Sequence, residues 1–367
     1  MAEEQQKKSH PVRISCFLPL AMSVIVLLNY FPVKAQSGGG YVFSFLNLVA
    51  PARPAALGGS AIATRADDIT LSAMNPALLS EAMDAQVSFS YVGYVAGIRY
   101  GNLMAARHLK KWGTLGFNLH YVSYGQFNAT DVDGSQTGTF SAGEYAFQLG
   151  WSKLLDSTFS IGANMKYILS DLGPENRSIG IAVDAGANWF SRDKLWSASM
   201  LIRNAGRQLT TYQSGEREKL PFEIQAGISR QLPKAPFRFS LILQQMQRWD
   251  LTYSDPSLSG VDPLTGEDRA EKITFADKAL RHVIINTEVL LSKNFNLRFG
   301  YNFLRRNELG FTEKKGMSGM SFGLGFRINR FQLSYARTVY NVAGGSNHLT
   351  ITTNLKSFLK NGSAAGF

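Results

Sequence analysis

The most regular feature of this sequence is an alternation of apolar and polar residues over many short segments. Between residues 159 and 167 every odd position is apolar and every even position is polar or glycine. Residues 115–121, 295–303 and 322–328 show the same period of two. Because successive side chains of a β-strand point to opposite faces, this period predicts strands with one apolar and one polar face.

About fourteen such segments follow one another along the chain, each close to the roughly 9–11 residues of a tilted transmembrane strand. They begin near Gln86, Tyr94, Gly113, Thr139, Ser157, Arg177, Trp196, Pro221, Phe237, Arg281, Phe295, Met317, Phe331 and Asn347. Counts of twelve or sixteen are compatible with the same pattern. The sequence therefore predicts an all-β fold, a transmembrane antiparallel β-barrel of about fourteen strands with a small N-terminal hatch, or plug.

Short and long connections alternate between these segments. The short ones lie at residues 108–111, 155–157, 191–194, 232–235, 292–294 and 329–330. The long ones lie at residues 128–138, 171–176, 206–219 and 250–279. Outer-membrane barrels have short periplasmic turns and longer outer loops, so the alternation predicts which rim faces the periplasm. The first pair is the exception, because Gly93 is nearly its whole connection.

The width of such a barrel decides which face meets lipid. Eight strands enclose about as much space as inward side chains can fill, so fourteen strands should point their apolar face outward and close into a sheet without edges. The interior should then carry polar and charged side chains. This predicted lumen lining consists of Asn118, His120, Asn164, Lys166, Asp184, Glu223, Arg238, Glu288, Arg298 and Arg327.

The tryptophans fit the same arrangement. Trp112, Trp151, Trp189 and Trp196 fall near short turns, and Trp249 borders the longest loop. Aromatic girdles are expected at both membrane interfaces of a barrel. The alternative is that these residues are core aromatics of a soluble β-sandwich.

Residues 1–35 have the layout of a secretory signal peptide. Lys7, Lys8 and Arg13 precede an apolar stretch at residues 14–31, and Ala35 ends a small-residue cleavage motif. A single N-terminal anchor helix is the alternative. Cys16, the only cysteine, lies inside this segment, so the exported chain would contain no thiol. No later stretch reaches the roughly 18 apolar residues of a spanning helix, which excludes a helical membrane protein.

The net charge of +11 and the pI of about 9.6 change this interpretation little. Lysine and arginine are scattered along the chain and form no run or helical stripe, which argues against nucleic acid as a partner. In a surface protein, basic residues in turns and loops are better suited to anionic lipid headgroups or lipopolysaccharide.

Residues 36–85 do not alternate and should form the hatch, before a barrel at residues 86–357 and a C-terminal tail at residues 358–367. An acidic start at Asp67 and Asp68 is favourable for a short helix. Pro76 can occupy the first turn of a second one, following Asn75 and preceding Ala77. The alternative is a disordered periplasmic leader.

Several of these residues resemble a known family. Asp67 and Asp68, followed by Asn75-Pro76-Ala77, look like the hatch motif of the long-chain fatty-acid transporter (FadL-like) superfamily of fourteen-stranded barrels. Within it, residues 51–59, 75–79 and 89–91, and less specifically 349–355, resemble the PorV/PorQ group of the type IX secretion system.

This resemblance implies a non-enzymatic outer-membrane component of protein secretion. Members of the group are understood to hold a cell-surface partner (PorZ-like) beside PorV-like and PorU-like components in an attachment complex. The candidate docking loop carries Asp255, Asp262, Glu267, Asp268 and Arg269. The alternative implied by the superfamily is a transporter of hydrophobic compounds such as long-chain fatty acids.

The sequence offers little catalytic chemistry. The histidines, at positions 10, 108, 120, 282 and 348, have no local metal-binding spacing. The run from Asp131 to Gly134 lacks the further oxygen ligands of a calcium loop. No nucleophile, phosphate-binding or zinc-protease motif occurs. We therefore expect no enzyme activity, metal or cofactor.

Overall fold

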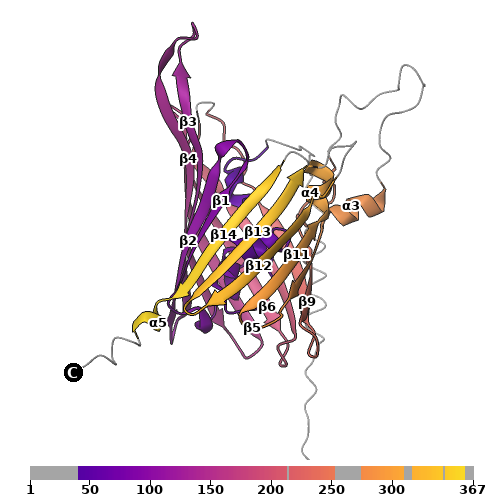
Figure 1. Cartoon of the computed structure of the whole chain (residues 1–367). Helices are drawn as coiled ribbons and strands as arrows, with labels where there is room; N and C mark the ends of the chain where they lie inside the picture. The colour runs from indigo at the N-terminus through magenta and orange to yellow at the C-terminus, as the bar shows by residue number, and fades with distance from the viewer. Residues whose placement is uncertain (1–39, 213–214, 253–273, 310–315, 342–343, 360–367) are drawn as a thin grey trace, which may run out of the picture. The chain divides into compact units, whose positions relative to one another are not determined.

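Fourteen antiparallel strands form one closed barrel in the computed structural model, which describes residues 40–212, 215–252, 274–309, 316–341 and 344–359 (Figure 1). Each strand pairs with its neighbours in sequence, and β1 pairs with β14 to close the sheet, with Gln86 opposite Asn354. Because every strand has two partners, the sheet closes on itself, as a spanning sheet must. The predicted fold class is confirmed.

The strands differ in length around the wall. In order they are β1 (Gln86–Gly93), β2 (Arg99–Leu109), β3 (Gly113–Thr130), β4 (Gln136–Leu154), β5 (Phe159–Asp171), β6 (Arg177–Phe190), β7 (Trp196–Thr210), β8 (Glu223–Gln231), β9 (Phe237–Leu243), β10 (Val283–Val289), β11 (Phe295–Asn302), β12 (Met320–Ile328), β13 (Phe331–Asn341) and β14 (Gly344–Asn354). All begin within five residues of the predicted position. The largest shift is at β2, because the short helix η7 (Val95–Gly97) precedes it, so the expectation that Gly93 is nearly the whole connection was wrong.

The two faces of the wall have the predicted polarity. In β5 the polar side chains of Asn164 and Lys166 are buried inside the barrel, whereas Met165 and Tyr167 on the other face are 61% and 44% exposed. The same alternation of polar interior and apolar exterior is what a lipid environment requires of a barrel. The architecture is therefore that of an outer-membrane barrel. Among the described residues, no helix is long and apolar enough to cross a membrane.

The two rims differ in the length of their connections. At the lower rim of Figure 1 the strands are joined by short turns and β14 runs into α5 (Lys356–Leu359). This is the inner, periplasmic rim by the rule that short turns face the periplasm. Trp112, Trp151, Trp189 and Trp196 lie next to these turns, as predicted, and Trp249 lies beyond β9 toward the other rim.

At the outer rim, β3 and β4 extend well beyond their neighbours as a two-stranded ribbon (Figure 1). Residues 125–142 pair only with each other, because β2 stops pairing at Ser123 and β5 stops at Gly143. The expectation of a loop at residues 128–138 was therefore wrong, since strand structure occupies most of it. The predicted loop at 206–219 is also shorter, because β7 continues to Thr210. A hydrogen-bonded hairpin satisfies the backbone groups that a loop would leave to water.

The longest predicted connection is described only at its ends. The capping box of Thr274 and Asp277 starts α3 (Phe275–Arg281), and the rings of Trp249 and Phe275 lie 5.1 Å apart. The proposed docking residues Asp255, Asp262, Glu267, Asp268 and Arg269 lie outside the described residues. The outer rim also carries α4 (Phe303–Leu309) after β11.

Residues 40–85 form a plug inside the barrel (Figure 1). It contains η3 (Ser44–Asn47), α2 (Ala52–Ala56), η4 (Ile69–Ala73), η5 (Pro76–Leu78) and η6 (Glu81–Met83). The Asp68 carboxylate accepts the Thr70 N–H at 3.0 Å and starts η4. The predicted helix starts are confirmed, but both helices are 3₁₀ turns, of five and three residues.

Glycines on the inner face of the wall allow the plug to approach closely. A Cβ at Gly162 would lie 2.5 Å from the Ala77 nitrogen, and one at Gly300 would lie 2.1 Å from the Gly58 nitrogen. Atoms cannot approach so closely, and a packed interior has no room to shift. The core of the molecule is therefore the contact between plug and wall, built on buried plug residues such as Phe45, Leu57, Ile69, Leu71 and Met83.

Candidate functional site

The plug is fixed to the wall by a buried ionic cluster. Arg53 of α2 donates from Nε and Nη2 to the two oxygens of Glu288 on β10, at 2.9 and 3.0 Å, and from Nη1 to Asp68 Oδ2 at 3.0 Å. The side chains of all three are at most 7% exposed. Such a bidentate pairing is the strongest hydrogen-bond geometry that arginine offers a carboxylate.

Two further arginines share the same glutamate. Arg238 Nη1 of β9 lies 2.7 Å from Glu288 Oε2, and Arg298 Nε of β11 lies 3.3 Å from Oε1. We call the five residues Arg53, Asp68, Arg238, Glu288 and Arg298 the plug latch. Three guanidinium groups thus surround two carboxylates. Burial raises the pKa of Asp68, but the Arg53 charge, the Thr70 hydrogen bond and the Arg298 charge together lower it by more, so it lies below its usual range.

A second buried cluster belongs to the wall itself. Lys166 Nζ of β5 lies 2.8 Å from Asp184 Oδ2 of β6 and donates to Asn204 Oδ1 of β7 at 2.7 Å. The Asp184 carboxylate also accepts the Asn204 backbone N–H at 2.8 Å. We call Lys166, Asp184 and Asn204 the wall cluster.

The wall cluster stabilises an irregularity in the strand pairing. Asn204 has a φ of 55°, and the β6–β7 register shifts between Val183 and Ala185. Beyond this bulge β7 has only β6 as a partner, because its pairing with β8 ends at Arg203–Glu223. A bulge of this kind redirects a strand and leaves polar groups to be satisfied by side chains, which Asp184 and Lys166 do here.

Hydrogen bonds from other parts of the wall also reach the plug. Thr350 Oγ1 accepts the Ala52 N–H at 2.8 Å, and Ser160 donates to the Ala77 carbonyl at 2.8 Å. His348 Nδ1 lies 3.2 Å from the Ala50 carbonyl oxygen. The plug is therefore attached to β5, β10 and β14, on well-separated parts of the wall.

The spaces inside the barrel are very unequal. Two spaces between plug and wall at mid-depth measure about 10 and 20 Å³, and a single water needs roughly 10–15 Å³. Two recesses at the inner rim measure about 440 and 490 Å³. They lie on either side of the plug segment that contains Ala66 and Asp67. These two mid-depth spaces are thus no larger than one or two water molecules, whereas the periplasmic mouth is hollowed.

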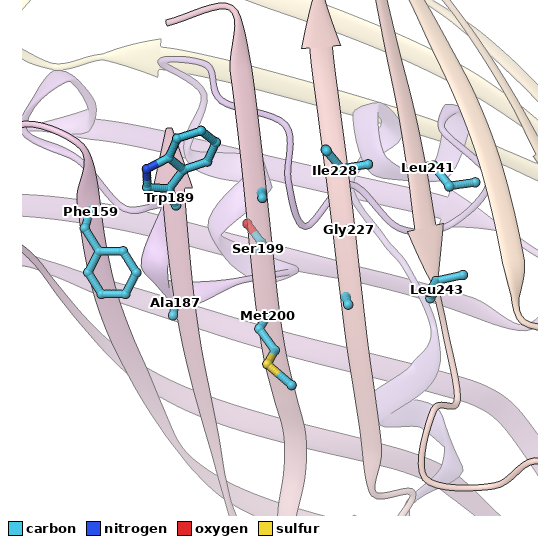
Figure 2. A pocket seen from close by; sticks show the side chains of 11 residues that line it. Phe159, Ala187, Trp189, Ser199, Met200, Gly227, Ile228, Leu241 and Leu243 are labelled. Carbon is cyan, nitrogen blue, oxygen red and sulfur yellow. The ribbon is translucent and has the colours of Figure 1, made fainter. Parts of the chain in front are cut away.

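A groove of about 470 Å³ runs along the outside of the wall over β5 to β9 (Figure 2). Ala187, Ala198 and Ala226 form part of its lining. Larger apolar side chains such as Trp189, Met200 and Ile228 lie beside them (Figure 2). The groove lies on the apolar outer face, where lipid acyl chains pack in a barrel of this kind.

The residues predicted for the lumen are largely where the alternation placed them. Asn118, His120, Asn164, Lys166, Asp184, Glu223, Glu288 and Arg298 are buried inside the barrel. Arg238 is partly buried in the plug latch, whereas Arg327 is exposed at the inner rim and lines one of the recesses. His120 is stacked on Phe45 of the plug at 5.7 Å between ring centroids, so it is a packing residue.

The hatch-motif residues have separate positions. Asp68 belongs to the plug latch, Asp67 lines the inner-rim recesses, and Asn75 caps η5 with Pro76 and Ala77 packed against the wall. Within the described ranges, no group of three or more His, Cys, Asp or Glu side chains could hold a metal ion. Asp131 and Gly134 form the turn at the tip of the ribbon.

Sequence reasoning missed the residue that organises the latch. Arg53 lies between Pro51 and Pro54 in an otherwise apolar stretch. A single charged residue in such an apolar stretch needs a buried partner of opposite charge. The predicted inward-facing Glu288 could have been proposed as that partner. The role of Asn204 had no comparable signal, because its conformation depends on the bulge.

Comparisons with known proteins concern the fold alone. No protein-family model matches the chain, and no curated protein matches it either. Among solved structures it is similar to the Pseudomonas putida toluene transporter TodX, with a TM-score of 0.46 and 13% identity over 83% of this chain and 97% of that chain. The Ralstonia pickettii toluene transporter TbuX gives a TM-score of 0.48 and 10% identity over 85% and 98%. A Pseudomonas aeruginosa FadL homologue gives 0.44 and 10% over 83% and 98%.

Proposed function

We propose that this protein is a non-enzymatic outer-membrane anchor of the type IX secretion system, most like PorQ, that holds a cell-surface partner in an attachment complex. The observation that carries the proposal is the packed interior. The plug packs against the wall at mid-depth, two spaces between them measure about 10 and 20 Å³, and the plug latch fixes the plug in place. A barrel closed in this way is suited to hold a partner protein at the cell surface rather than to let solutes pass through its lumen.

The outer rim supplies surfaces for such a partner. The β3–β4 ribbon projects beyond the wall, and its strands have unpaired edges over residues 125–142. Unpaired strand edges invite pairing with another chain. The loop with Asp255, Asp262, Glu267, Asp268 and Arg269 is the other candidate surface for a PorZ-like partner, beside PorV-like and PorU-like components.

An affinity pull-down from detergent-solubilised outer membrane tests this proposal. We expect the tagged protein to bring down a surface protein in stoichiometric amount, together with lipopolysaccharide. Deleting residues 255–269, or replacing residues 128–138 by a two-residue turn, should each be compared with the intact chain. Loss of the partner in one variant, with the barrel still folded, identifies the docking surface.

Transport of hydrophobic compounds such as long-chain fatty acids is the second candidate. The similar solved barrels named above are described as toluene transporters and a FadL homologue, and none is described as a secretion component. In this chain, the interrupted pairing between β7 and β8 beyond Arg203–Glu223 favours it, because a ligand leaving sideways needs a gap in the wall.

The two candidates differ in a direct measurement. A transporter should accelerate entry of a labelled fatty acid into vesicles and should copurify with such lipids. An anchor should do neither and should retain its surface partner. Recovery of the barrel alone with bound fatty acid would refute the anchor.

A further inference from the structure

One of the two inner-rim recesses carries an excess of positive charge. The recess of about 440 Å³ lies between the plug and the ends of β9, β11 and β12. Its acidic lining residues are Asp67 and Asp68, and its basic lining residues are Arg53, Arg238, Lys293 and Arg327. Four cations therefore face two anions in a concave site open to the periplasm.

The floor of the recess, deep in the barrel, is formed by charged groups that are already paired with one another. Arg53 binds Glu288 and Asp68, and Arg238 binds Glu288 and donates to Gln231 Oε1 at 2.7 Å. Behind them Arg298 also approaches Glu288. The carboxylates nearby are thus shared among three guanidinium groups, and the local charge remains positive.

The mouth of the recess, on its periplasmic side, has basic side chains without acidic partners. Among the described residues, neither Lys293 nor Arg327 forms an ion pair, and the Arg327 side chain donates from Nη2 to Gln332 Oε1 at 3.4 Å. Asn296 also lines the recess, and its buried Oδ1 has no hydrogen-bond partner in the described part of the chain.

We propose that this recess is a binding site for an oxyanion, a carboxylate or a phosphate, presented from the periplasmic side. Arginine and lysine side chains are the usual partners of both groups, and a concave site with a positive field concentrates anions. Lys293 and Arg327 would bind the oxyanion directly, and the plug latch would form the positive floor. The site lies at the opposite rim from the proposed docking surfaces, so it adds a periplasmic ligand to the proposed function and is independent of it.

Titration calorimetry on the purified full-length mature protein in dodecyl maltoside tests the site, at constant ionic strength. The probes are inorganic phosphate, the short-chain lipid dihexanoyl phosphatidylglycerol, and acetyl-triglycine with a free or an amidated C-terminus. Phosphate, lipid and free carboxylate then separate an inorganic ion, a lipid headgroup and a chain end as sources. The variant is Lys293→Gln with Arg327→Gln. The matched control is Lys153→Gln with Lys234→Gln, two basic residues near other inner-rim turns that do not line the recess.

We expect at least one oxyanion probe to bind the native protein and the control alike. It should bind the Lys293 and Arg327 variant at least about tenfold more weakly, since one charge-assisted hydrogen bond alone is worth about that factor and two are lost. Equal affinity in all three proteins would overturn the site. Equal weakening in both double variants would also overturn it, because it would show diffuse surface charge. The site would likewise be overturned if none of the probes bound the native protein.

Discussion

The two buried ionic clusters of this barrel look alike but connect different things. In the plug latch, Arg53 comes from the plug and Glu288 from the wall. In the wall cluster, Lys166, Asp184 and Asn204 all belong to neighbouring strands. Both are buried, and in both a carboxylate accepts from more than one donor.

The plug latch should therefore hold the plug in the barrel, whereas the wall cluster should maintain the course of β7. Removing one partner of a buried ion pair leaves an uncompensated charge and is strongly destabilising wherever it occurs. In the plug latch that cost falls on the contact between plug and wall, so the plug should be released first. In the wall cluster it falls on a bulge in β7, so the strand should be deformed while the plug stays in place.

The largest effect is expected for Glu288→Gln, which leaves three guanidinium groups without their shared carboxylate. We expect a loss of about 3–5 kcal/mol in the stability of the docked plug. Ion conductance in planar bilayers should then rise above that of the native protein. Asp184→Asn is the matched variant and should lower the stability of the barrel while conductance stays at the native level. Equal conductance in both variants would contradict the separation of roles.

A smaller loss is expected for Gly300→Ala, because the added Cβ would lie 2.1 Å from the Gly58 nitrogen. Overpacking of this kind costs about 1–3 kcal/mol. The measurement is the urea midpoint, together with the rate of proteolysis within the plug. Gly93→Ala is the control, since nothing lies within 4 Å of the position of its Cβ. If both variants behave alike, the close approach of plug and wall does not limit stability.

Asn204 tests the wall cluster in the same way. Asn204→Ala removes the hydrogen bonds to Lys166 and to the Pro221 carbonyl and keeps a side chain at a φ of 55°. We expect a loss of about 1–3 kcal/mol. Asn204→Gly should lose less, because glycine adopts this φ without strain. Equal melting temperatures would show that only the side-chain contacts matter, and the opposite order would contradict strain at this φ.

The smallest effect concerns Asp84 at the inner rim. Hydrogen bonds from Lys356 and from the His108 N–H hold the pKa of this carboxyl below its usual range. The stabilisation is therefore present above the ordinary pKa of an aspartate and is lost as the pH falls through the lowered value. We expect α5 to exchange its amide hydrogens faster below about pH 4, with a change under about 1 kcal/mol because the pair is near solvent. Asp84→Asn should show the faster exchange at every pH.

The wall was predictable because its signal is local. The two faces of each strand can be recognised from the alternation of apolar and polar residues within about ten positions. Seven of the fourteen strands, such as β3, β6 and β11, begin at the predicted residue. The ribbon was missed because residues 128–138 are polar on both faces. A strand with no buried face has no alternation to detect.

The interior was only half predictable. Alternation placed Lys166, Asp184 and Glu288 inside, but it gave no information about which of them would meet. One partner of Glu288 is Arg53, which is separated from it by 235 residues. The inward glycines, such as Gly162 and Gly300, looked like gaps in a polar pattern. They are the places where the plug touches the wall.

The seam between the first and last strands has a consequence for how the molecule is assembled. The plug precedes β1, yet α2 packs against β11, β12, β13 and β14, which come late in the chain. Contacts that join distant parts of a chain form slowly, because a long loop must close first. The plug therefore cannot make all of its contacts with the wall until the late strands have formed and β14 has paired with β1. A chain truncated before β14 would lose both the closed barrel and the contacts of α2 with β14.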